Sequence, residues 1–445
     1  MTIKDIKEKS RLNLRTVLRA LKYKNYRLFF GGQIISLTGT WMQQVAVSWL
    51  VYRLTNDAFL LGVVGFSSQI PTFLISPFAG VIADRISRHR IIIATQILSL
   101  LQALALVFLY YGGDINVWHV IVLNSFLGFI NGFDIPVRQA FVIEMVENKE
   151  DLGNAIALNS MMFNSARLIG PSAAGLLIAS LGEGLCFLIN ALSYIAVITA
   201  LVSMKINFVK NEKKQRRIIK ELKEGFVYTW KFTPIKVLLM LVGLVSLTGM
   251  PYVVLMPIFA RDILGGGSDT LGFLLGAVGV GALIGAVFLA SRKTVIGLGK
   301  VIRNTTVLFG IVLILFSLSK HFILSQILMV GAGFSVMVQM SSCNTIIQTL
   351  VDDDKRGRVM SFYTMAFMGT MPLGSLIAGS FASKIGAPLT LIIGGLFCLM
   401  GALFFAYYLP SLRKIIRPIY IKMGILREVA NGIQSATSMR VPPQS

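Results

Sequence analysis

Long apolar runs dominate this chain of 445 residues and leave few folds open to it. Each run is roughly 20 residues long, the length at which a helix crosses the hydrocarbon of a bilayer. A backbone in lipid must satisfy its own hydrogen bonds, so such runs are expected to be helical. Only 14% of residues are charged and the mean hydropathy is +0.74, which is too little polarity for a soluble protein of this size. We therefore predict an all-α membrane protein with about twelve transmembrane helices, near residues 28–51, 59–82, 91–111, 116–141, 155–180, 185–204, 237–260, 270–290, 301–319, 321–346, 359–383 and 387–409.

A net charge of +22 raises the question of nucleic-acid binding, but the basic residues are confined to short connections between the apolar runs. They gather on alternate connections, which is the positive-inside pattern of a plasma-membrane protein. The pattern predicts that both termini are cytoplasmic and that there is no nucleic-acid partner. The predicted order is a cytoplasmic N-terminal segment (1–26), an N-terminal six-helix bundle (27–204), a cytoplasmic linker (205–236), a C-terminal six-helix bundle (237–409) and a cytoplasmic tail (410–445).

The two halves of the chain repeat each other weakly. The segment Ser36-Leu-Thr-Gly39 recurs 210 positions later as Ser246-Leu-Thr-Gly249. Internal symmetry of this kind is typical of transporters built from two related bundles around a central site. A receptor or a membrane-bound enzyme has no reason to show it, so the repeat favours a transporter and argues against an enzyme.

A charged motif, Gly80-Val-Ile-Ala-Asp84-Arg85-Ile-Ser-Arg88-His-Arg90, connects the second and third runs. Glycine permits close helix approach, and Asp84 can accept hydrogen bonds from arginines or from a helix N-terminus. We predict that this motif is a charge lock on the cytoplasmic gate. The alternative is an ordinary cluster of cytoplasmic basic residues. The predicted gating residues are Gly80, Asp84, Arg85, Arg88 and Arg90.

The fifth run contains Gly170-Pro171-Ser-Ala-Ala-Gly175. Proline removes a helix hydrogen bond and small residues permit tight packing, so this helix is expected to bend against a neighbour. A merely kinked helix interface is the alternative.

Together these motifs resemble the major facilitator superfamily. The order of Asp134–Phe141, Leu152–Ala155 and Arg356–Ser361 is similar to the drug–proton antiporter-3 type, a group that includes enterobactin-type siderophore exporters and macrolide efflux pumps. The resemblance runs from about residue 20 to residue 409 and implies a major facilitator fold. It also implies that the fifth-run motif belongs to an exporter, and that the first, fourth, seventh and tenth spans line a central cavity.

Three charges lie deep within predicted spans, at Asp134, Arg138 and Arg167. An ionisable side chain at that depth costs about 2.5–3.5 kcal/mol, so it normally faces a partner or a cavity. Asp134 and Arg167 lie at similar depth and could pair, and Asp134 could equally pair with Arg138 one turn away. Asp134 either neutralises an arginine permanently or exchanges a proton in each transport cycle. If transport is coupled to protons, these three residues are the candidates.

A polar stripe on the first span indicates a water-filled path, because a polar face is unfavourable against lipid. Polar positions on the fourth, seventh and tenth spans extend it, with interhelical hydrogen bonding as the alternative for any single residue. The predicted cavity-lining residues are Gln33, Ser36, Thr40, Gln44, Ser48, Asn124, Asn131, Tyr252, Gln339 and Ser342.

The sequence thus predicts a secondary exporter of a small amphipathic molecule, drug-like or siderophore-like, that works by alternating access in exchange for protons. The sequence has no Walker-type loop, so it gives no support for transport driven by nucleotide hydrolysis. We expect a monomer in membrane lipid with no cofactor and no metal, since Cys186, Cys343 and Cys398 show no metal-ligand spacing. The alternatives are a facilitator that imports a nutrient and a non-transporting membrane sensor or assembly factor.

Overall fold

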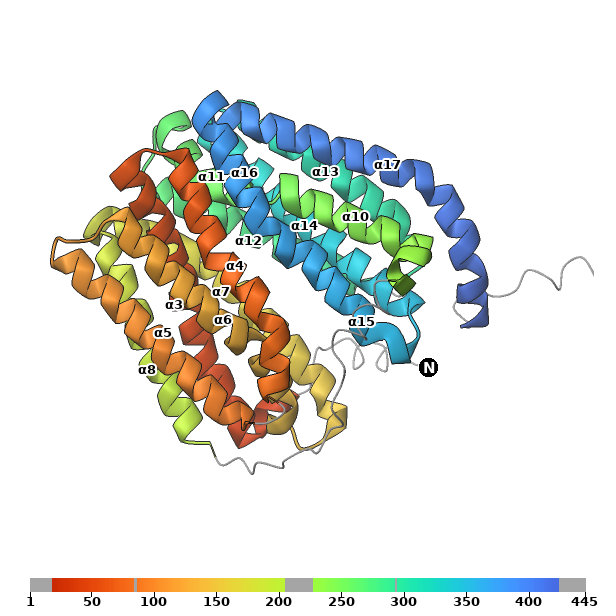
Figure 1. Cartoon of the computed structure of the whole chain (residues 1–445), viewed down its shortest axis with the longest axis horizontal. Coiled ribbons are helices and arrows are strands. Elements are labelled where there is room, and N and C mark those ends of the chain that lie inside the picture. The colour runs from red at the N-terminus through yellow and green to blue at the C-terminus, as the bar shows by residue number, and fades with distance from the viewer. Residues whose placement is uncertain (1–17, 84–85, 205–226, 293, 424–445) are drawn as a thin grey trace, which may run out of the picture.

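The computed structural model describes residues 18–83, 86–204, 227–292 and 294–423 (Figure 1). These residues are almost entirely helical and contain no strand. The N-terminal bundle begins with the short helix η1 (Arg19–Lys22) and has one further short turn, η2 (Lys149–Asp151). Its six long helices are α3 (Lys24–Thr55), α4 (Ala58–Ala83), α5 (Arg88–Tyr111), α6 (Val117–Met145), α7 (Leu152–Leu181) and α8 (Glu183–Val202).

The C-terminal bundle also has six segments that run from end to end, two of them made of several helical pieces. The elements are α10 (Thr233–Thr248), α11 (Tyr252–Ile258), the π-helix η3 (Phe259–Ile263), α12 (Ser268–Ala290), α13 (Leu298–Leu318), α14 (Phe322–Leu350), α15 (Asp353–Thr364), the π-helix η4 (Met365–Gly369), α16 (Thr370–Ile385) and α17 (Ala387–Lys422). The first segment runs from α10 to η3, and the fifth from α15 to α16. The all-α fold of two six-helix bundles is therefore confirmed.

The predicted spans 301–319 and 321–346 follow each other almost directly, and the structure has a real break between them, from the end of α13 to the start of α14. The end of the last span differs from the prediction. We placed the start of a tail at Pro410, but α17 continues through Pro410 and Pro418 to Lys422. A proline removes one backbone hydrogen bond from a helix without necessarily ending it. Figure 1 shows this helix curving away beyond its neighbours.

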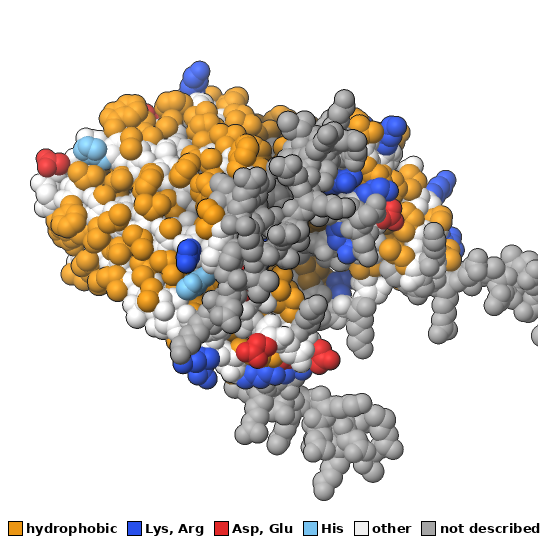
Figure 2. All heavy atoms as spheres, turned by 60° about the horizontal axis from the view of Figure 1, so that its bottom comes forward, with side chains coloured by type: hydrophobic (Ala, Val, Ile, Leu, Met, Phe, Trp, Pro, Cys, Tyr) orange, Lys and Arg blue, Asp and Glu red, His pale blue; other side chains and the backbone are white. Residues whose placement is uncertain are grey.

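Charge distinguishes the two ends of the molecule. We call the end that carries Arg19, Arg88, Arg292 and Arg356 the basic end, and the opposite one, with Glu183, the far end. Within the described ranges, ten segments are long and apolar enough to span a membrane, and the two remaining long helices, α3 and α7, are more polar. Hydrophobic side chains cover the flanks of the molecule in Figure 2, as expected of a surface that faces lipid.

The bundles meet at two crossings of closely packed helices, α4 with α16 and α7 with α12. A pair of glycines lies at each crossing. A Cβ on Gly62 would meet the Ser375 carbonyl oxygen at 2.6 Å, and a Cβ on Gly272 would meet the Pro171 carbonyl oxygen at 2.5 Å. Both crossings lie toward the far end, and in Figure 1 the bundles spread apart toward the basic end. A cavity of about 380 Å³ lies at the basic end, lined by Asn344, Thr345, Gln348, Thr349 and Arg356.

The internal repeat predicted from sequence is present in the structure. The helices α5 and α13 begin 210 positions apart, at Arg88 and Leu298, and α6 and α14 begin 205 apart, at Val117 and Phe322. The close contact of Gly128 with Ser68 recurs at these offsets as that of Gly333 with Val278. The offsets let any position in one bundle be compared with its equivalent in the other.

Candidate functional site

Asp134 lies within the N-terminal bundle on α6 and is only 3% exposed. One carboxylate oxygen, Oδ1, accepts hydrogen bonds from Thr95 Oγ1 at 2.8 Å and from Gln96 Nε2 at 2.9 Å, both on α5. The other, Oδ2, lies 3.2 Å from Nη2 of Arg138, one turn along α6. The buried charge is therefore paired and hydrogen-bonded, as burial requires.

Arg138 connects this carboxylate to the first long helix. Its Nη1 donates a 2.8 Å hydrogen bond to Oε1 of Gln33 on α3. The Gln33 side chain is fully buried, whereas that of Arg138 is 24% exposed. Of the two pairings open to Asp134 from sequence, the structure therefore forms the one with Arg138.

Arg167 does not pair with Asp134 in this structure. Its guanidinium carbon lies 5.8 Å from the centre of the Trp41 ring, and the guanidinium interacts electrostatically with Tyr252 of the other bundle. Phe163 packs edge-on against Trp41 at 5.8 Å. Among the described residues no carboxylate pairs with Arg167. Arg167 thus lies between aromatic rings contributed by both bundles.

The polar stripe on α3 divides into two environments. Gln33 and Ser36 are buried within the bundle, whereas Gln44 is exposed. The hydroxyls of Thr40 and Ser48 donate to backbone carbonyls of their own helix, at 2.9 Å each. The stripe is therefore not one continuous surface.

The remaining predicted cavity residues are dispersed. Asn124 is buried and donates to the Val120 carbonyl oxygen of its own helix at 2.9 Å, while Asn131 is half-buried. Gln339 and Ser342 on α14 are buried, and their side-chain polar atoms have no hydrogen-bond partner among the described residues. Tyr252 is buried and packs edge-on against Phe309.

The predicted gating motif is described only in part. Asp84 and Arg85 lie outside the described residues, Gly80 lies in α4, and Arg90 is exposed. Arg88 forms an ion pair of 2.8 Å with Glu144, which joins the start of α5 to the end of α6. This ion pair lies within one bundle at the basic end.

The motif on α7 lies where that helix meets two others. A Cβ on Gly170 would come within 2.6 Å of the Trp41 Cβ on α3. A Cβ on Gly175 would come within 2.7 Å of the Ser268 carbonyl oxygen at the start of α12. Pro171, between them, is inside the helix and buried. The small residues thus permit the same part of α7 to pack closely against α3 of its own bundle and against α12 of the other bundle.

Sequence reasoning missed a set of contacts that join the bundles at the far end. The Tyr52 hydroxyl donates a short hydrogen bond to Oδ2 of Asp262, and Arg261 Nη1 donates to Asn56 Oδ1 at 2.7 Å. The Arg261 guanidinium also lies 5.8 Å from the Tyr52 ring. Arg261 and Asp262 belong to the π-helix η3. No periodic pattern marks these residues, because a π-helix turn cannot be recognised from apolar spacing.

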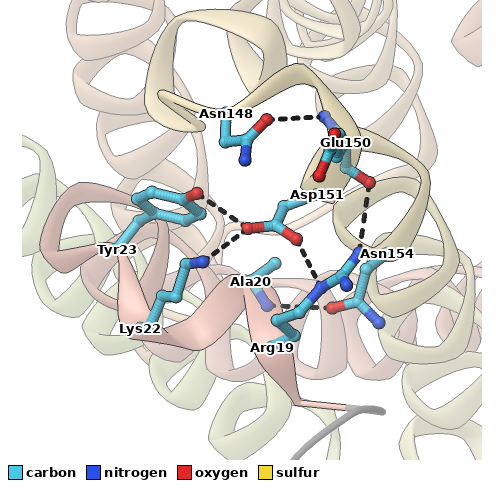
Figure 3. Close-up of polar contacts among 8 residues, drawn as sticks. All are labelled: Arg19, Ala20, Lys22, Tyr23, Asn148, Glu150, Asp151 and Asn154. Atoms are coloured by element: carbon cyan, nitrogen blue, oxygen red, sulfur yellow. Dashed lines mark hydrogen bonds and ion pairs between the residues drawn. The ribbon is translucent and has the colours of Figure 1, made fainter.

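A second cluster at the basic end joins η1 to η2 (Figure 3). Asp151, whose side chain is 3% exposed, forms ion pairs with Arg19 and with Lys22, the latter at 2.7 Å, and accepts a 2.7 Å hydrogen bond from Tyr23. The Ala20 backbone amide donates to the Asn154 side chain at 2.9 Å. The Lys22 ammonium and the Tyr23 hydroxyl hold the pKa of Asp151 below its ordinary value.

Comparison with known proteins identifies the family. Residues 16–416 match the family described as "Transmembrane secretion effector" (MFS_3). The staphyloferrin A transporter of Staphylococcus aureus is 26% identical over 373 residues, covering 83% of this chain and 92% of that protein. The multidrug efflux pump Tap of Mycolicibacterium fortuitum is 24% identical over 380 residues, with 83% and 92% covered.

Solved structures show the same fold. A bacterial homologue of the human lysosomal transporter Spinster, solved in an inward-facing and unoccupied conformation, superposes with a TM-score of 0.67 at 13% identity, covering 88% of this chain and 98% of that one. Since the family match spans nearly all the described helices, the chain is a multi-pass membrane transporter of small molecules and not an enzyme. It belongs to the transmembrane secretion effector family of the major facilitator superfamily, among efflux-type transporters.

Proposed function

We propose that this protein exports a small amphipathic molecule, drug-like or siderophore-like, from the cytoplasm in exchange for protons. The named relatives are a staphyloferrin A transporter and a multidrug efflux pump, which supports the export of a siderophore-like or drug-like molecule. The positive-inside pattern supports a plasma-membrane location with the basic end and both termini in the cytoplasm. The chain is proposed to act as a monomer, with its cavity between its own two bundles.

The observation that carries the proton coupling is the position of Asp134. It is a buried acid whose charge is balanced by Arg138, and Arg138 is itself partly exposed. Protonation of Asp134 would release Arg138 from its ion pair, while Gln33 on α3 would keep its hydrogen bond to the guanidinium. A proton could in this way change the contact between α6 and α3.

The proposed substrate contacts are Trp41, Phe163 and Arg167. The aromatic rings offer apolar surface, and Phe163 is 46% exposed. Arg167 has no carboxylate partner among the described residues, so a polar or acidic group of the substrate could provide one. An amphipathic molecule has both features.

Alternating access is supported by the asymmetry between the two ends. The far end is joined across the bundles by Tyr52–Asp262 and Arg261–Asn56, whereas toward the basic end the bundles spread apart (Figure 1). The structure would then represent the state that loads substrate from the cytoplasm. Export would require these far-end contacts to open.

The test is Asp134→Asn in purified protein reconstituted into liposomes. We expect proton-driven efflux to fall by at least about 100-fold, because a proton carrier is lost. Substrate counterflow, which needs no net proton movement, should persist. Asp114→Asn removes an exposed acid from a far-end connection and serves as the control, with efflux unchanged. Undiminished proton-driven efflux in Asp134→Asn would remove Asp134 from the mechanism.

A further inference from the structure

The interior of the N-terminal bundle is unusually polar for a region buried within a membrane protein. Among the described residues of α3, α5, α6 and α8, eleven polar side chains are at most 5% exposed, and all but Glu183 at the far end lie in the bundle interior. They recur at helical spacing along α3 and α5, so each set faces one direction. The ten interior residues are Gln33, Ser36, Gln43, Thr95, Gln96, Ser99, Gln102, Asp134, Asn190 and Ser193.

These ten side chains, here called the polar series, include one hydrogen-bonded group around Asp134 and another around Gln43. The hydroxyl of Tyr194 on α8 interacts with Thr40, Asn190 and Ser99, and the same residue interacts electrostatically with Asp134. Asn190 Nδ2 donates to Gln43 Oε1 at 2.7 Å, and Gln43 Nε2 donates to Gln102 Oε1 at 3.1 Å. Along α5, Gln102 lies nearer the far end than Thr95 and Gln96 do.

Three polar atoms along this series lack a hydrogen-bond partner among the described residues. They are Nε2 of Gln33, Oε1 of Gln96 and Nε2 of Gln102, all in side chains at most 4% exposed. A buried polar group left unpaired costs about 1–3 kcal/mol, so such groups are normally paired by ordered water. Three such atoms in the polar series indicate several water positions.

The fold requires only part of this polarity, as the internal repeat shows. The equivalents of Thr95, Gln96 and Asp134 are the buried polar residues Thr305, Thr306 and Gln339, but other positions differ. In α13, the position equivalent to Ser99 is Phe309, and that equivalent to Gln102 is Val312, both buried. The same bundle architecture therefore packs well with apolar side chains at these positions. For α3, the offset of 210 that relates Ser36 to Ser246 makes Gln43 equivalent to Val253. For α8, counting from its first residue and from that of α17 makes Asn190 equivalent to Gly394.

An apolar layer separates the polar series from the far end. It consists of Leu50, Leu106 and Phe187, each fully buried and each lying between the amide cluster and the far end on its own helix. Beyond it, Glu183 pairs with Arg53 at 2.8 Å and accepts a hydrogen bond from Tyr110 at 2.9 Å. The polar interior is thus closed toward the far end in this conformation.

We propose that this polar series holds an internal water compartment that carries protons to and from Asp134, separately from the substrate cavity. The proposal rests on the proton coupling proposed above. A hydronium ion in the compartment gives its proton to the Asp134 carboxylate and leaves a water molecule, and release is the reverse step. Among the described residues, the charged and titratable groups that face Asp134 are Arg138 on its own helix and Tyr194 on α8. The Leu50–Leu106–Phe187 layer prevents protons from leaking through the compartment between the far end and the basic end.

The first test removes one amide with a side chain of similar size. We expect Gln102→Leu to lower proton-driven efflux by about tenfold or more, since a proton transfer step is impaired. Substrate counterflow and the melting temperature of the protein should remain near wild type. Thr306→Val, which removes a buried hydroxyl from α13 of the other bundle, is the matched control and should change neither rate. An equal loss of efflux and counterflow in Gln102→Leu would overturn the proposal, because it would indicate a structural role.

The proposed water compartment and the proposed role of Asp134 in proton coupling can be tested separately. If Asp134→Asn abolishes proton-driven efflux while Gln102→Leu leaves it unchanged, the proton reaches Asp134 from the substrate cavity and the compartment is excluded. If Asp134→Asn has no effect, the proton coupling proposed above is itself wrong.

A direct test for water uses hydroxyl-radical labelling by X-ray radiolysis of the purified protein. Radicals form from water bound next to a buried side chain, so Tyr194 should be labelled although it is 4% exposed. Phe309, which is fully buried in the other bundle at the position equivalent to Ser99, should not be labelled. Labelling of Tyr194 should fall in Gln102→Leu. Absence of label on Tyr194 in the wild-type protein would refute the compartment.

Discussion

Asp151 shows how one carboxylate can organise a whole segment at the basic end. It receives the charges of Arg19 and Lys22 and the hydroxyl of Tyr23, all contributed by residues before or at the start of α3 (Figure 3). The Lys22 ammonium and the Tyr23 hydroxyl lower its pKa from 3.8. A carboxyl whose pKa is lowered in the folded state stabilises that state above its unfolded pKa, and the stabilisation disappears as the pH falls through the folded pKa.

We therefore expect Asp151→Asn to lower the melting temperature of the protein, because two cations and a hydroxyl lose their common partner. The loss should be constant at neutral and mildly acidic pH, since Asp151 stays ionised there, and should shrink only below 3.8. Melting curves over a pH series measure this. Glu150→Gln, at the exposed neighbouring position, is the control. A loss that changed with pH around neutrality would show that another group controls the cluster.

At the scale of helices, the crossing of α7 and α12 depends on the absence of side chains. Gly175 and Gly272 let the two backbones approach to a distance at which a Cβ on Gly272 would lie 2.7 Å from the Gly175 Cα. Gly62 and Gly379 do the same for α4 and α16. The two crossings are equivalent under the internal repeat, so the bundles are held together by one kind of contact used twice.

Gly272→Val should push α12 away from α7 and cost about 1–3 kcal/mol, the usual penalty of overpacking. We expect a lower melting temperature and slower transport, measured as counterflow so that proton coupling plays no part. Gly31→Val is the matched control, because a Cβ on Gly31 of α3 would meet nothing within 4 Å. Similar losses in both variants would mean that the cost comes from helix propensity and not from the crossing.

For the whole molecule, the balance between its two ends determines which side is open. The far end is held by Tyr52–Asp262 and Arg261–Asn56, contacts that join the two bundles directly. A hydrogen bond to a partly exposed carboxylate contributes about 1 kcal/mol, which corresponds to roughly a fivefold change in a conformational equilibrium. These few contacts are thus enough to bias the transporter toward the state described here.

Tyr52→Phe should therefore raise the population open at the far end by roughly fivefold, since only the hydroxyl is lost. Spin labels at Asp114 and Lys320, exposed positions at the far end of different bundles, would report this as a longer distance component. Unchanged distance distributions would show that the glycine crossings, and not these polar contacts, keep the far end closed.

Much of the fold could be predicted from sequence because hydropathy measures the environment that decides it. The spans followed from apolar length, and even the short break at Ser319–His321 was visible. The π-helices η3 and η4 were not, because an inserted residue alters hydrogen bonding without altering hydropathy. The helical continuation of α17 beyond Pro410 was missed for a related reason, since proline weakens a helix but does not always end it.

The site could be predicted only to the level of candidate charges. Asp134 is conspicuous as an acid within a span, but its hydrogen bonds to Thr95 and Gln96 depend on how α5 is rotated. Rotation also separates Gln43, which bonds within the bundle, from Gln44, which is exposed. Neighbouring residues on a helix point about 100° apart, and a helical wheel cannot fix which face is inside when both faces are polar.

The polarity of α3 has a consequence for how the protein is made. Among the described helices it precedes the other long ones along the chain, yet it is more polar than the ten segments that are apolar enough to span a membrane. Its buried amides, Gln33 and Gln43, find their partners on helices synthesised afterwards. A nascent chain that stops after α3 should therefore be poorly retained by the membrane. We expect α3 to be stably inserted in the membrane only after α4 and α5 have been synthesised and can pack against it.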